Sequence, residues 1–358
     1  MLSRPIPACP IPDATAPGRP GPGRPGPSRP GPGRPGPGDP APGPPARGSR
    51  PGRRVLLAAG LAGSLPGRLP GALARALAGG AAAGSLVGCS PADLANALAP
   101  RGGYALREGI AYGEGPRHRL DLYRPDGLAA GMPLVVFFYG GNWDSGARGL
   151  YRFVAATLAR QGWAVAVPDY RLYPEIRFPA FLEDCAAAVA FLARERAALG
   201  LPPGPVVLAG HSAGAYNAVM LALDRRWLSR AGAPPPAGAV GLAGPYDFLP
   251  LESGMLRDLF RADADPGGLP ATQPIAYARA DAPPLLLLTG TDDTTVRPAN
   301  SERLAARQRA LGAEARLVEY PGLGHVGLIA TFARGLPLYT GAVPAEVGRF
   351  VGALPGTA

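Results

Sequence analysis

From about residue 104 onward, short apolar runs alternate with longer stretches in which apolar residues recur at helical spacing. A short, continuously apolar run is typical of a strand that is buried on both faces, and apolar residues every three to four positions are typical of a helix. Strands that alternate with helices form a mostly parallel sheet with helices on both faces. The pattern therefore predicts an α/β fold. The expected central strands are 133–139, 163–168, 206–209, 239–243, 285–289 and 315–320, and the expected helices are 150–158, 178–192, 213–223 and 301–311.

Two regions depart from this alternation. Residues 105–112 and 118–123 alternate in polarity and predict an antiparallel pair of strands. Residues 247–279 interrupt the rhythm of strands and helices and predict a small cap over the edge of the sheet. Together these segments predict one domain over 104–355, which is long enough to bury a single sizeable core.

The chain before this domain has a different composition. Residues 1–54 contain 18 Pro and 11 Gly, many of them in pentads such as 18–22 and 23–27. A period of five is not the Gly-every-third-residue repeat of collagen, and the segment has almost no bulky apolar residue to bury. We therefore expect residues 1–54 to be disordered and residues 89–103 to form a linker that leads into the folded domain.

Residues 55–88 have the features of a secretion signal. Arg68 and Arg75 lie close to an apolar stretch at 76–86, which is too short to span a membrane but fits the core of a signal peptide. The Leu-Val-Gly-Cys string that ends at Cys89 resembles the lipobox of bacterial lipoproteins, which implies lipidation of Cys89 and a protein in the cell envelope, periplasmic or anchored to a membrane. The alternative is an Ala/Gly-rich linker with an incidental cysteine in a cytoplasmic protein.

The formal net charge of +10 belongs almost entirely to the N-terminal segments. Residues 1–88 have a net charge of +9, whereas residues 89–358 have a net charge of +1. A nucleic-acid-binding domain needs basic charge clustered on its folded surface. We therefore expect no nucleic-acid partner.

The cysteines are too few and too far apart for a disulfide framework or a zinc site. Cys9, Cys89 and Cys185 form no CxxC motif and leave an odd number. Cys185 falls in a predicted helix and is expected to be a small buried residue. The sequence predicts no metal and no organic cofactor.

A candidate nucleophile stands between a predicted strand and a predicted helix. The string Gly210-His211-Ser212-Ala213-Gly214 has the G-x-S-x-G form, whose glycines allow the sharp turn that lifts a serine hydroxyl clear of a sheet. Such a string arises by chance in a glycine-rich chain, so its position carries the prediction. A serine hydroxyl is a weak nucleophile, and it needs a base that is oriented by an acid.

The chain has only three histidines to provide the base. His211 adjoins the serine, where it would point away from its neighbour. His118 precedes the central sheet, where we expect an exposed or hydrogen-bonded imidazole. His325 directly follows the last predicted strand, on a loop at the same end of the sheet as Ser212. His325 is therefore the expected base.

Two adjacent aspartates are candidates for the orienting acid. Asp292 and Asp293 follow the predicted strand at 285–289 and precede the histidine by about thirty residues, so that either could reach the imidazole. Asp247 and Asp281 are more remote alternatives. The order serine, aspartate, histidine along the chain is that of the hydrolase fold rather than that of the two serine-protease folds.

Small residues after the strand at 133–139 could stabilise an oxyanion. Gly140, Gly141 and Asn142 allow backbone N–H groups to approach a developing negative charge, and Ala213, just after the serine, offers another donor. A plain turn is the alternative interpretation of this string.

The order of these motifs resembles the α/β-hydrolase superfamily, on the esterase and lipase branch that includes carboxylesterases and kynurenine-formamidase-like enzymes. The resemblance covers about residues 100–355. It rests on FYGGNW at 138–143, PDYRLYP at 168–174, GHSAG at 210–214, GTDDTTV at 290–296 and the Gly-His pair that ends at residue 325.

The resemblance also implies roles for single residues. The acid is the fourth residue of a G-x-x-D-x-x-V string, which falls on Asp293. The oxyanion donors of an H-G-G-G-type loop fall on Gly141 and Asn142. This chain departs from the pattern with Tyr139 in place of the usual His and Asn142 in place of the third Gly. Two residues of the D-Y-R-L string, Asp169 and Arg171, are expected to brace this loop.

The sequence therefore predicts a serine hydrolase that cleaves a small-molecule carboxylic ester through an acyl-enzyme, with Ser212, Asp293 and His325 as its catalytic triad. An aryl formamidase that acts on an N-formyl substrate shares this triad and is one alternative. A non-catalytic binding module is another, because a fold does not dictate a function.

Overall fold

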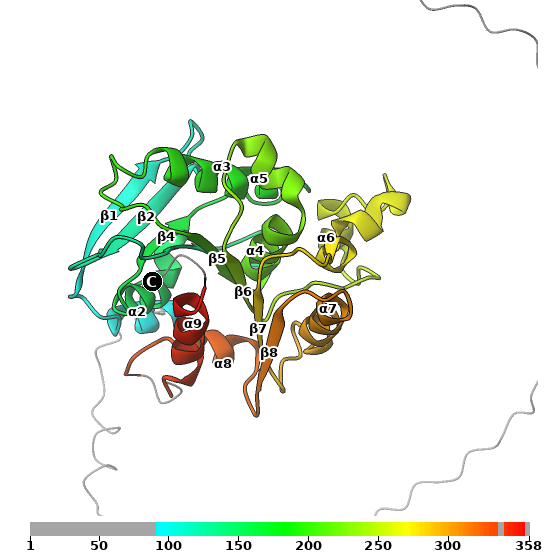
Figure 1. Ribbon diagram of the computed structural model, residues 1–358. Helices are drawn as coiled ribbons and strands as arrows, with labels where there is room; N and C mark the ends of the chain where they lie inside the picture. Colours follow the sequence, from blue (N-terminus) through cyan, green and yellow to red (C-terminus); the bar gives the residue numbers. More distant parts are fainter. Residues whose placement is uncertain (1–90, 336–339, 355–358) are drawn as a thin grey trace, which may run out of the picture. The chain divides into compact units, whose positions relative to one another are not determined.

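The computed structural model describes residues 91–335 and 340–354. The expected disordered segment 1–54, the expected signal region 55–88 and Cys89 lie outside the described residues. The described chain is built around an eight-stranded sheet with helices on both faces (Figure 1). The strands are β1 (Tyr104–Ala111), β2 (Arg119–Pro125), β3 (Leu134–Phe138), β4 (Ala164–Pro168), β5 (Val206–His211), β6 (Gly238–Leu242), β7 (Leu285–Gly290) and β8 (Ala315–Tyr320).

The strand order across the sheet is β1-β2-β4-β3-β5-β6-β7-β8. Strand β2 runs antiparallel to both of its neighbours, and the other neighbouring pairs are parallel. The predicted fold class is confirmed: the sheet is mostly parallel, and the predicted antiparallel pair is β1 with β2.

The burial of the strands explains why their sequences predict their positions. All residues of the central strands β3, β4, β5, β6 and β7 are buried, as expected for strands covered on both faces. The edge strands β1 and β8 instead mix buried, half-buried and exposed residues. An apolar run therefore marks the centre of this sheet, and a mixed pattern marks its edges.

Two groups of helices cover the sheet. Helices α2 and α9 pack together on one face, and α3, α4 and α5 pack together on the other (Figure 1). Helix α4 is buried at every position, which fits its place between the central strands and the neighbouring helices. Helix α7 packs against β7 and β8. The bounds are α2 (Arg152–Ala159), α3 (Ala180–Arg194), α4 (Ala213–Leu223), α5 (Arg225–Ala231), α7 (Ala299–Ala310) and α9 (Ala342–Gly352).

The segment 89–103, expected as a linker, contains the short helix α1 (Pro91–Ala97). Asn96 joins it to the domain: its Nδ2 donates to the Gly149 carbonyl at 2.8 Å, and its Oδ1 accepts the N–H of Phe153 at 3.1 Å. These contacts dock α1 on α2 and on the 3-10 helix η1 (Arg148–Tyr151). Seven residues present too short an apolar pattern for such a helix to be predicted.

The segment 247–279, expected as a small cap, folds into three short pieces between β6 and β7. They are α6 (Gly254–Leu259), η2 (Pro266–Thr272) and η3 (Pro274–Tyr277). The Tyr216 hydroxyl of α4 donates to the Thr272 carbonyl at 2.6 Å, and the Phe178 N–H donates to the Leu259 carbonyl at 2.9 Å. The segment is therefore attached to the main body of the domain by buried contacts.

Parallel pairing brings the C-terminal ends of four strands to the same end of the sheet. Phe138 at the end of β3 pairs with Gly210 in β5, and Gly290 at the end of β7 pairs with Tyr320 at the end of β8. The loops that follow these strands therefore converge. Within residues 91–335 and 340–354, none of the helices combines the length and the apolar character that crossing a membrane requires.

Candidate active site

Ser212 occupies the sharp turn between β5 and α4. Its φ of 56° and ψ of −123° are a strained combination for a residue with a side chain. Glycines let the turn close, because a Cβ on Gly210 would lie 2.2 Å from the Gly214 carbonyl oxygen, and one on Gly214 would lie 2.0 Å from the Phe138 carbonyl oxygen. The turn holds the serine hydroxyl at the end of the sheet, as a nucleophile elbow requires.

The structure brings Ser212, His325 and Asp293 together although their loops are far apart in the sequence. The Ser212 Oγ lies 2.9 Å from the His325 Nε2, and the His325 Nδ1 lies 2.8 Å from the Asp293 Oδ2. His325 is the first residue of the short helix α8 (His325–Ala330), which follows β8. The three side chains thus form one hydrogen-bond chain that a serine nucleophile, a histidine base and an orienting acid require.

The two adjacent aspartates have different surroundings. Asp293 is buried, and its Oδ1 accepts the backbone N–H groups of Thr295 and Val296 at 2.9 and 2.8 Å. Burial alone would raise the pKa of the Asp293 carboxyl, but the hydrogen bond from His325 and those from the two N–H groups outweigh it, so the pKa is lowered. Asp292 is exposed and bonds to the Thr291 hydroxyl instead. Asp293 is therefore the carboxylate that reaches the imidazole.

The other candidate residues lie in different contacts. Asp247 pairs with an arginine of α7, and Asp281 pairs with an arginine of α5 and with Arg279, which follows η3. The His118 Nε2 lies 3.1 Å from the Asp184 Oδ1, so its imidazole is hydrogen-bonded, which was one of the two expectations for it. None of these three residues contacts the serine hydroxyl through a hydrogen bond among the described residues.

His211 is buried beside the His325 ring, with 4.9 Å between the ring centroids. Its Nδ1 lies 3.1 Å from the Tyr151 hydroxyl, and its Nε2 lies 3.3 Å from the His325 carbonyl oxygen. Burial, with a smaller contribution from the neighbouring imidazole, lowers the pKa of His211 to about 3. His211 is therefore a neutral neighbour of the triad.

The loop after β3 has an unusual backbone. Gly141, Asn142 and Trp143 have φ angles of 130°, 53° and 59°, in the left-handed half of the map. At Gly141 a side chain is excluded, since a Cβ would lie 2.3 Å from the Ser145 carbonyl oxygen. Among the described residues, no acceptor is hydrogen-bonded to the backbone N–H of Gly141, Asn142 or Ala213. These N–H groups can therefore serve an oxyanion.

Side chains from separate elements hold this loop. The Trp143 indole is buried, and its Nε1 donates to the Asn217 Oδ1 of α4 at 3.0 Å. The Tyr170 hydroxyl donates to the Tyr139 carbonyl at 2.8 Å, and the two rings stack with 4.7 Å between centroids. The Tyr173 N–H donates to the Trp143 carbonyl at 2.8 Å. Aromatic side chains and one buried amide therefore support the loop.

Asp169 and Arg171 were expected to brace this loop, but neither side chain hydrogen-bonds to residues 141–143. The Asp169 carboxylate bonds to the backbone and guanidinium of Arg148, and Arg171 bonds to the Asp184 carboxylate. The D-Y-R-L string does brace the loop, but through Tyr170. The hydrophobic environment at the end of β4 buries the ring and leaves only its hydroxyl to find a partner.

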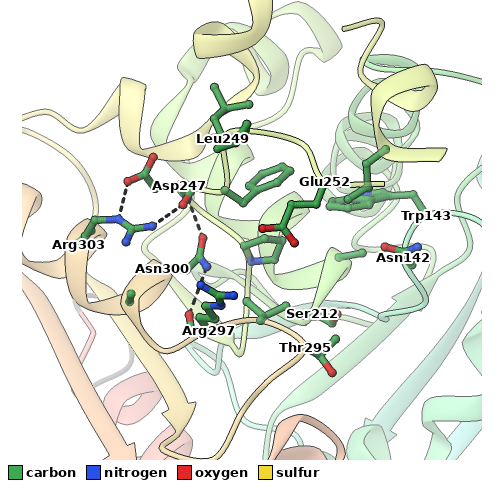
Figure 2. A pocket seen from close by; sticks show the side chains of 17 residues that line it. Asn142, Trp143, Ser212, Asp247, Leu249, Glu252, Thr295, Arg297, Asn300 and Arg303 are labelled. Atoms are coloured by element: carbon green, nitrogen blue, oxygen red, sulfur yellow. Dashed lines mark hydrogen bonds and ion pairs between the residues drawn. The ribbon is translucent and has the colours of Figure 1, made fainter. Parts of the chain in front are cut away.

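A cavity of about 770 Å³ lies over Ser212 (Figure 2). Trp143 of the β3 loop and side chains of the segment 247–279 provide its apolar lining. Polar and charged side chains lie beside Trp143, namely Asn142 and Glu252, and also near the start of α7 (Figure 2). The apolar lining is Trp143, Phe248, Leu249, Pro250 and Leu256, and the polar and charged lining includes Asn142, Asp247, Glu252, Arg297, Asn300 and Arg303.

The described residues contain no group of three or more His, Cys, Asp or Glu side chains that could hold a metal ion. Cys185 is buried, and the Asn217 Nδ2 lies 3.6 Å from its Sγ, so this cysteine belongs to the packing behind Trp143. Burial raises the pKa of its thiol well above the usual value.

Sequence reasoning missed three side chains that touch this site. Tyr151, Tyr170 and Asn217 contact the loop after β3 or its neighbours from η1, the end of β4 and α4. The D-Y-R-L string was a signal for Tyr170, but only its neighbours Asp169 and Arg171 were named from it. Tyr151 and Asn217 fall in predicted helices with nothing in their spacing to mark them.

Comparisons with known proteins agree with this architecture. Residues 120–307 match the model of the BD-FAE family. A probable isoprenylcysteine alpha-carbonyl methylesterase of Oryza sativa subsp. japonica is 30% identical over 235 residues, which cover 60% of this chain and 57% of that protein. The kynurenine formamidase of Salmo salar is 23% identical over 232 residues, which cover 63% of this chain and 76% of that protein.

Among solved structures, a truncated carbohydrate esterase from gut microbiota has a TM-score of 0.64 and 19% identity, covering 71% of this chain and 97% of that one. This likeness concerns the fold. The chain spans about half the length of the methylesterase relatives it matches. The family match covers more than half of the chain and includes the strand ends that carry Ser212 and Asp293. The chain belongs to the BD-FAE family and has the α/β-hydrolase fold.

Proposed function

We propose that this protein is a serine hydrolase that cleaves small-molecule carboxylic esters through an acyl-enzyme. The observation that carries the proposal is the hydrogen-bond chain from Ser212 through His325 to Asp293, with distances of 2.9 and 2.8 Å. This chain borders a cavity and lies beside backbone N–H groups that have no acceptor among the described residues. Acyl transfer needs these three parts together.

In the acylation step, the Ser212 Oγ forms a bond to the acyl carbon while the His325 Nε2 takes the hydroxyl proton. The negative charge of Asp293 stabilises the imidazolium and keeps the proton on Nδ1. The bond to the alcohol oxygen then breaks, and His325 gives its proton to the leaving alcohol. Water repeats these steps on the acyl-enzyme and releases the carboxylic acid.

The carbonyl oxygen of the substrate becomes an oxyanion in both steps. The backbone N–H groups of Gly141, Asn142 and Ala213 are the proposed donors. Their loop is already shaped by its positive φ angles and by the buried Trp143, so little reorganisation accompanies the reaction. Each preorganised donor of this kind contributes roughly 3 kcal/mol to transition-state binding.

The size and lining of the cavity support a small-molecule substrate. Pockets for such ligands commonly have volumes of about 300–1,000 Å³ and combine an apolar wall with a few polar groups. The cavity over Ser212 has a volume of about 770 Å³ and is lined by both apolar and polar side chains. The names of the relatives, a methylesterase and a carbohydrate esterase, support an ester bond without specifying its alcohol.

A formamide is the second candidate substrate, favoured by the similarity to a kynurenine formamidase. Amide hydrolysis would use the same groups, with His325 giving its proton to a leaving nitrogen. The two functions differ in the pocket that surrounds the triad, so they are separated by substrate and not by mechanism.

The test combines active-site labelling with a substrate series. We expect a fluorophosphonate probe to label the protein at Ser212, mapped by mass spectrometry, and Ser212→Ala to remove the label and the activity. p-Nitrophenyl esters of increasing acyl length and N-formylkynurenine are then compared by kcat/KM. Ester turnover well above formamide turnover supports the esterase, and the reverse supports the formamidase. An unlabelled, inactive parent protein would instead favour a non-catalytic binding module.

We also propose that Cys89 carries a lipid anchor that holds the enzyme at a membrane of the cell envelope. The apolar stretch at 76–86 and the lipobox-like string support this proposal. Each buried methylene of an acyl chain contributes about 0.8 kcal/mol, so more than one chain gives durable attachment. In a bacterial host, activity in the membrane fraction that Cys89→Ala releases to the soluble fraction is the expected result. An unprocessed, cytosolic product from the parent gene would contradict it.

A further inference from the structure

A tyrosine and a histidine connect the two loops that border Ser212. The Tyr151 hydroxyl of η1 accepts the backbone N–H of Gly140 at 3.2 Å and lies 3.1 Å from the His211 Nδ1. The His211 Nε2 lies 3.3 Å from the carbonyl oxygen of His325. A continuous path of hydrogen bonds thus runs from the loop after β3 to the loop after β8, and Ser212 is not part of it.

The groups at both ends determine the direction of every hydrogen bond in this path. The carbonyl oxygen of His325 only accepts, so the His211 Nε2 must carry the proton. His211 is neutral because it is buried, and its Nδ1 is therefore an acceptor for the Tyr151 O–H. The Tyr151 oxygen keeps its lone pairs for the Gly140 N–H. Each donor then has one acceptor, and no alternative arrangement satisfies all four groups.

The path ends on the peptide unit that leads into the loop after β3, which carries the proposed oxyanion donors Gly141 and Asn142 and is called the oxyanion loop below. The carbonyl of Tyr139 and the N–H of Gly140 belong to the same peptide bond. The Tyr170 hydroxyl donates to the carbonyl at 2.8 Å, and the Tyr151 hydroxyl accepts from the N–H. Two tyrosines therefore fix the plane of this peptide from both of its polar ends. The next two peptide units, which carry the N–H groups of Gly141 and Asn142, therefore start from a fixed plane.

The other end of the path holds the base. His325 is bound at three points: Nε2 by Ser212, Nδ1 by Asp293, and its backbone carbonyl by His211. The His211 ring also packs against the His325 ring, with 4.9 Å between centroids and 38° between planes. Ring orientation and backbone position are thus controlled by different partners.

We propose that Tyr151 and His211 are positioning residues that hold the oxyanion loop and the loop that carries His325 at a fixed position relative to each other. Neither residue lines the cavity over Ser212, and they act through Gly140 and through His325. The inference rests on the proposed hydrolase function. Errors of about 1 Å in such a site can lower turnover by about a hundredfold, so a link of this kind has a measurable effect.

The kinetic test uses variants that break the path at single points. Tyr151→Phe removes one hydroxyl and keeps the ring, and we expect kcat to fall about 10- to 50-fold while KM changes less than about threefold. Tyr104→Phe is the matched control, since Tyr104 lies on the edge strand β1 and its change also removes one hydroxyl hydrogen bond, to the Pro100 carbonyl. We expect that control to keep the parent kcat.

Variants of His211 test whether the hydrogen bond that its Nε2 donates is needed. His211→Gln can retain a donor near the Nε2 position, so we expect it to keep more activity than His211→Leu, which has neither a donor nor an acceptor. The double variant Tyr151→Phe/His211→Leu should be no slower than His211→Leu alone, because the path is already broken. Multiplicative losses would show two independent packing effects and would overturn the proposal.

A spectroscopic test does not depend on any ester being turned over. The chain has only three histidines, so ¹⁵N-histidine labelling gives three assignable imidazoles, with His118 as an internal reference bound to Asp184. At pH 7 we expect His211 to be neutral with its proton on Nε2, and Tyr151→Phe to shift the His211 Nδ1 and the His325 signals but not those of His118. A proton on the His211 Nδ1, or an unchanged spectrum in Tyr151→Phe, would overturn the proposal.

The two tests separate this proposal from the proposed function. A parent protein that neither reacts with the fluorophosphonate nor cleaves any ester would contradict the function, while the histidine spectra would still decide the hydrogen-bond path. If His211→Leu fails to fold, Tyr151→Phe and its spectrum remain decisive. Loss of kcat in Tyr151→Phe with a parent-like thermal unfolding midpoint supports positioning, and a loss that only parallels unfolding contradicts it.

Discussion

The two sides of Ser212 are built in different ways. On the acid and base side, loops that follow the neighbouring strands β7 and β8 are joined by backbone hydrogen bonds, from the Asp292 N–H to the Leu323 carbonyl at 3.0 Å and from the Thr291 N–H to the Tyr320 carbonyl at 3.1 Å. On the proposed oxyanion side, the loop after β3 has three consecutive positive φ angles and is held by side chains of three other segments.

The difference shows what each half of the site depends on. Strand pairing places the acid and the base, because parallel neighbours end at the same edge of the sheet and their loops meet. The oxyanion loop adopts a backbone shape that local sequence disfavours, and tertiary contacts must hold it there. The first side should therefore tolerate changes in nearby loop residues, and the second should be sensitive to changes far along the chain.

The largest effect is expected on the acid and base side. Asp293→Asn keeps the shape of the buried carboxylate but favours the wrong imidazole tautomer, and we expect kcat to fall by about 10⁴-fold. Asp292→Asn, the exposed neighbour, serves as the matched control and should change kcat less than about threefold. A larger loss in the control than at Asp293 would show that the acid has been assigned to the wrong residue.

The next largest effect is expected at the turn of the oxyanion loop. Gly141→Ala places a Cβ 2.3 Å from the Ser145 carbonyl oxygen, so the loop must move, and we expect kcat/KM to fall by about a hundredfold. Gly127→Ala is matched to it, since Gly127 also has a positive φ of 72° but has open space around its Cβ position. Equal losses of activity in the two variants would mean that the strained loop is not required for catalysis.

A smaller loss is expected from a residue that lies outside the loop itself. Asn217→Leu removes the acceptor for the Trp143 indole, and we expect kcat to fall about tenfold and the free energy of unfolding to fall by about 1–3 kcal/mol. Steady-state kinetics and urea unfolding measure the two effects. If activity is retained while stability falls, Asn217 supports the core but does not set the geometry of the oxyanion side.

The last effect is on stability and not on turnover, and it concerns the pH dependence at His211, which lies between the two sides. An unfolded histidine has a pKa near 6.5, whereas the pKa of buried His211 is about 3. The unfolded chain therefore binds more protons between these values, and the free energy of unfolding falls as the pH falls through this window and is fully retained above it. The expected slope is about 1.4 kcal/mol per pH unit.

His211→Gln removes this titration and provides the comparison. Between pH 7 and pH 5 we expect the parent to lose about 2 kcal/mol more than the variant, measured by urea unfolding at both values. An equal loss in parent and variant would show that His211 is already protonated in the folded protein. The hydrogen-bond directions derived for Tyr151 and His211 would then be wrong.

Most of the fold was predictable from single segments. The central strands are continuously apolar because both faces are buried, so their positions were read to within a few residues. Five of the described α-helices were not predicted: α1, α5, α6, α8 and α9. Four of these have six or seven residues, too few for a clear periodic pattern, and α9 is the second helix after β8 rather than one that directly follows a strand.

Local motifs and chain order were enough to nominate Ser212 and His325 and to narrow the acid to Asp292 or Asp293, because a strand-to-helix turn and the ends of parallel strands impose simple rules on what comes next in the sequence. The resemblance to the α/β-hydrolase superfamily then selected Asp293. The tertiary structure decided the partners that no rule of spacing reveals. Tyr151, Tyr170 and Asn217 reach the oxyanion loop from three separate segments, and His211 joins that loop to the base. Hydrogen bonds between such side chains depend on where helices and strands pack, and packing is a property of the whole fold rather than of any short string of residues.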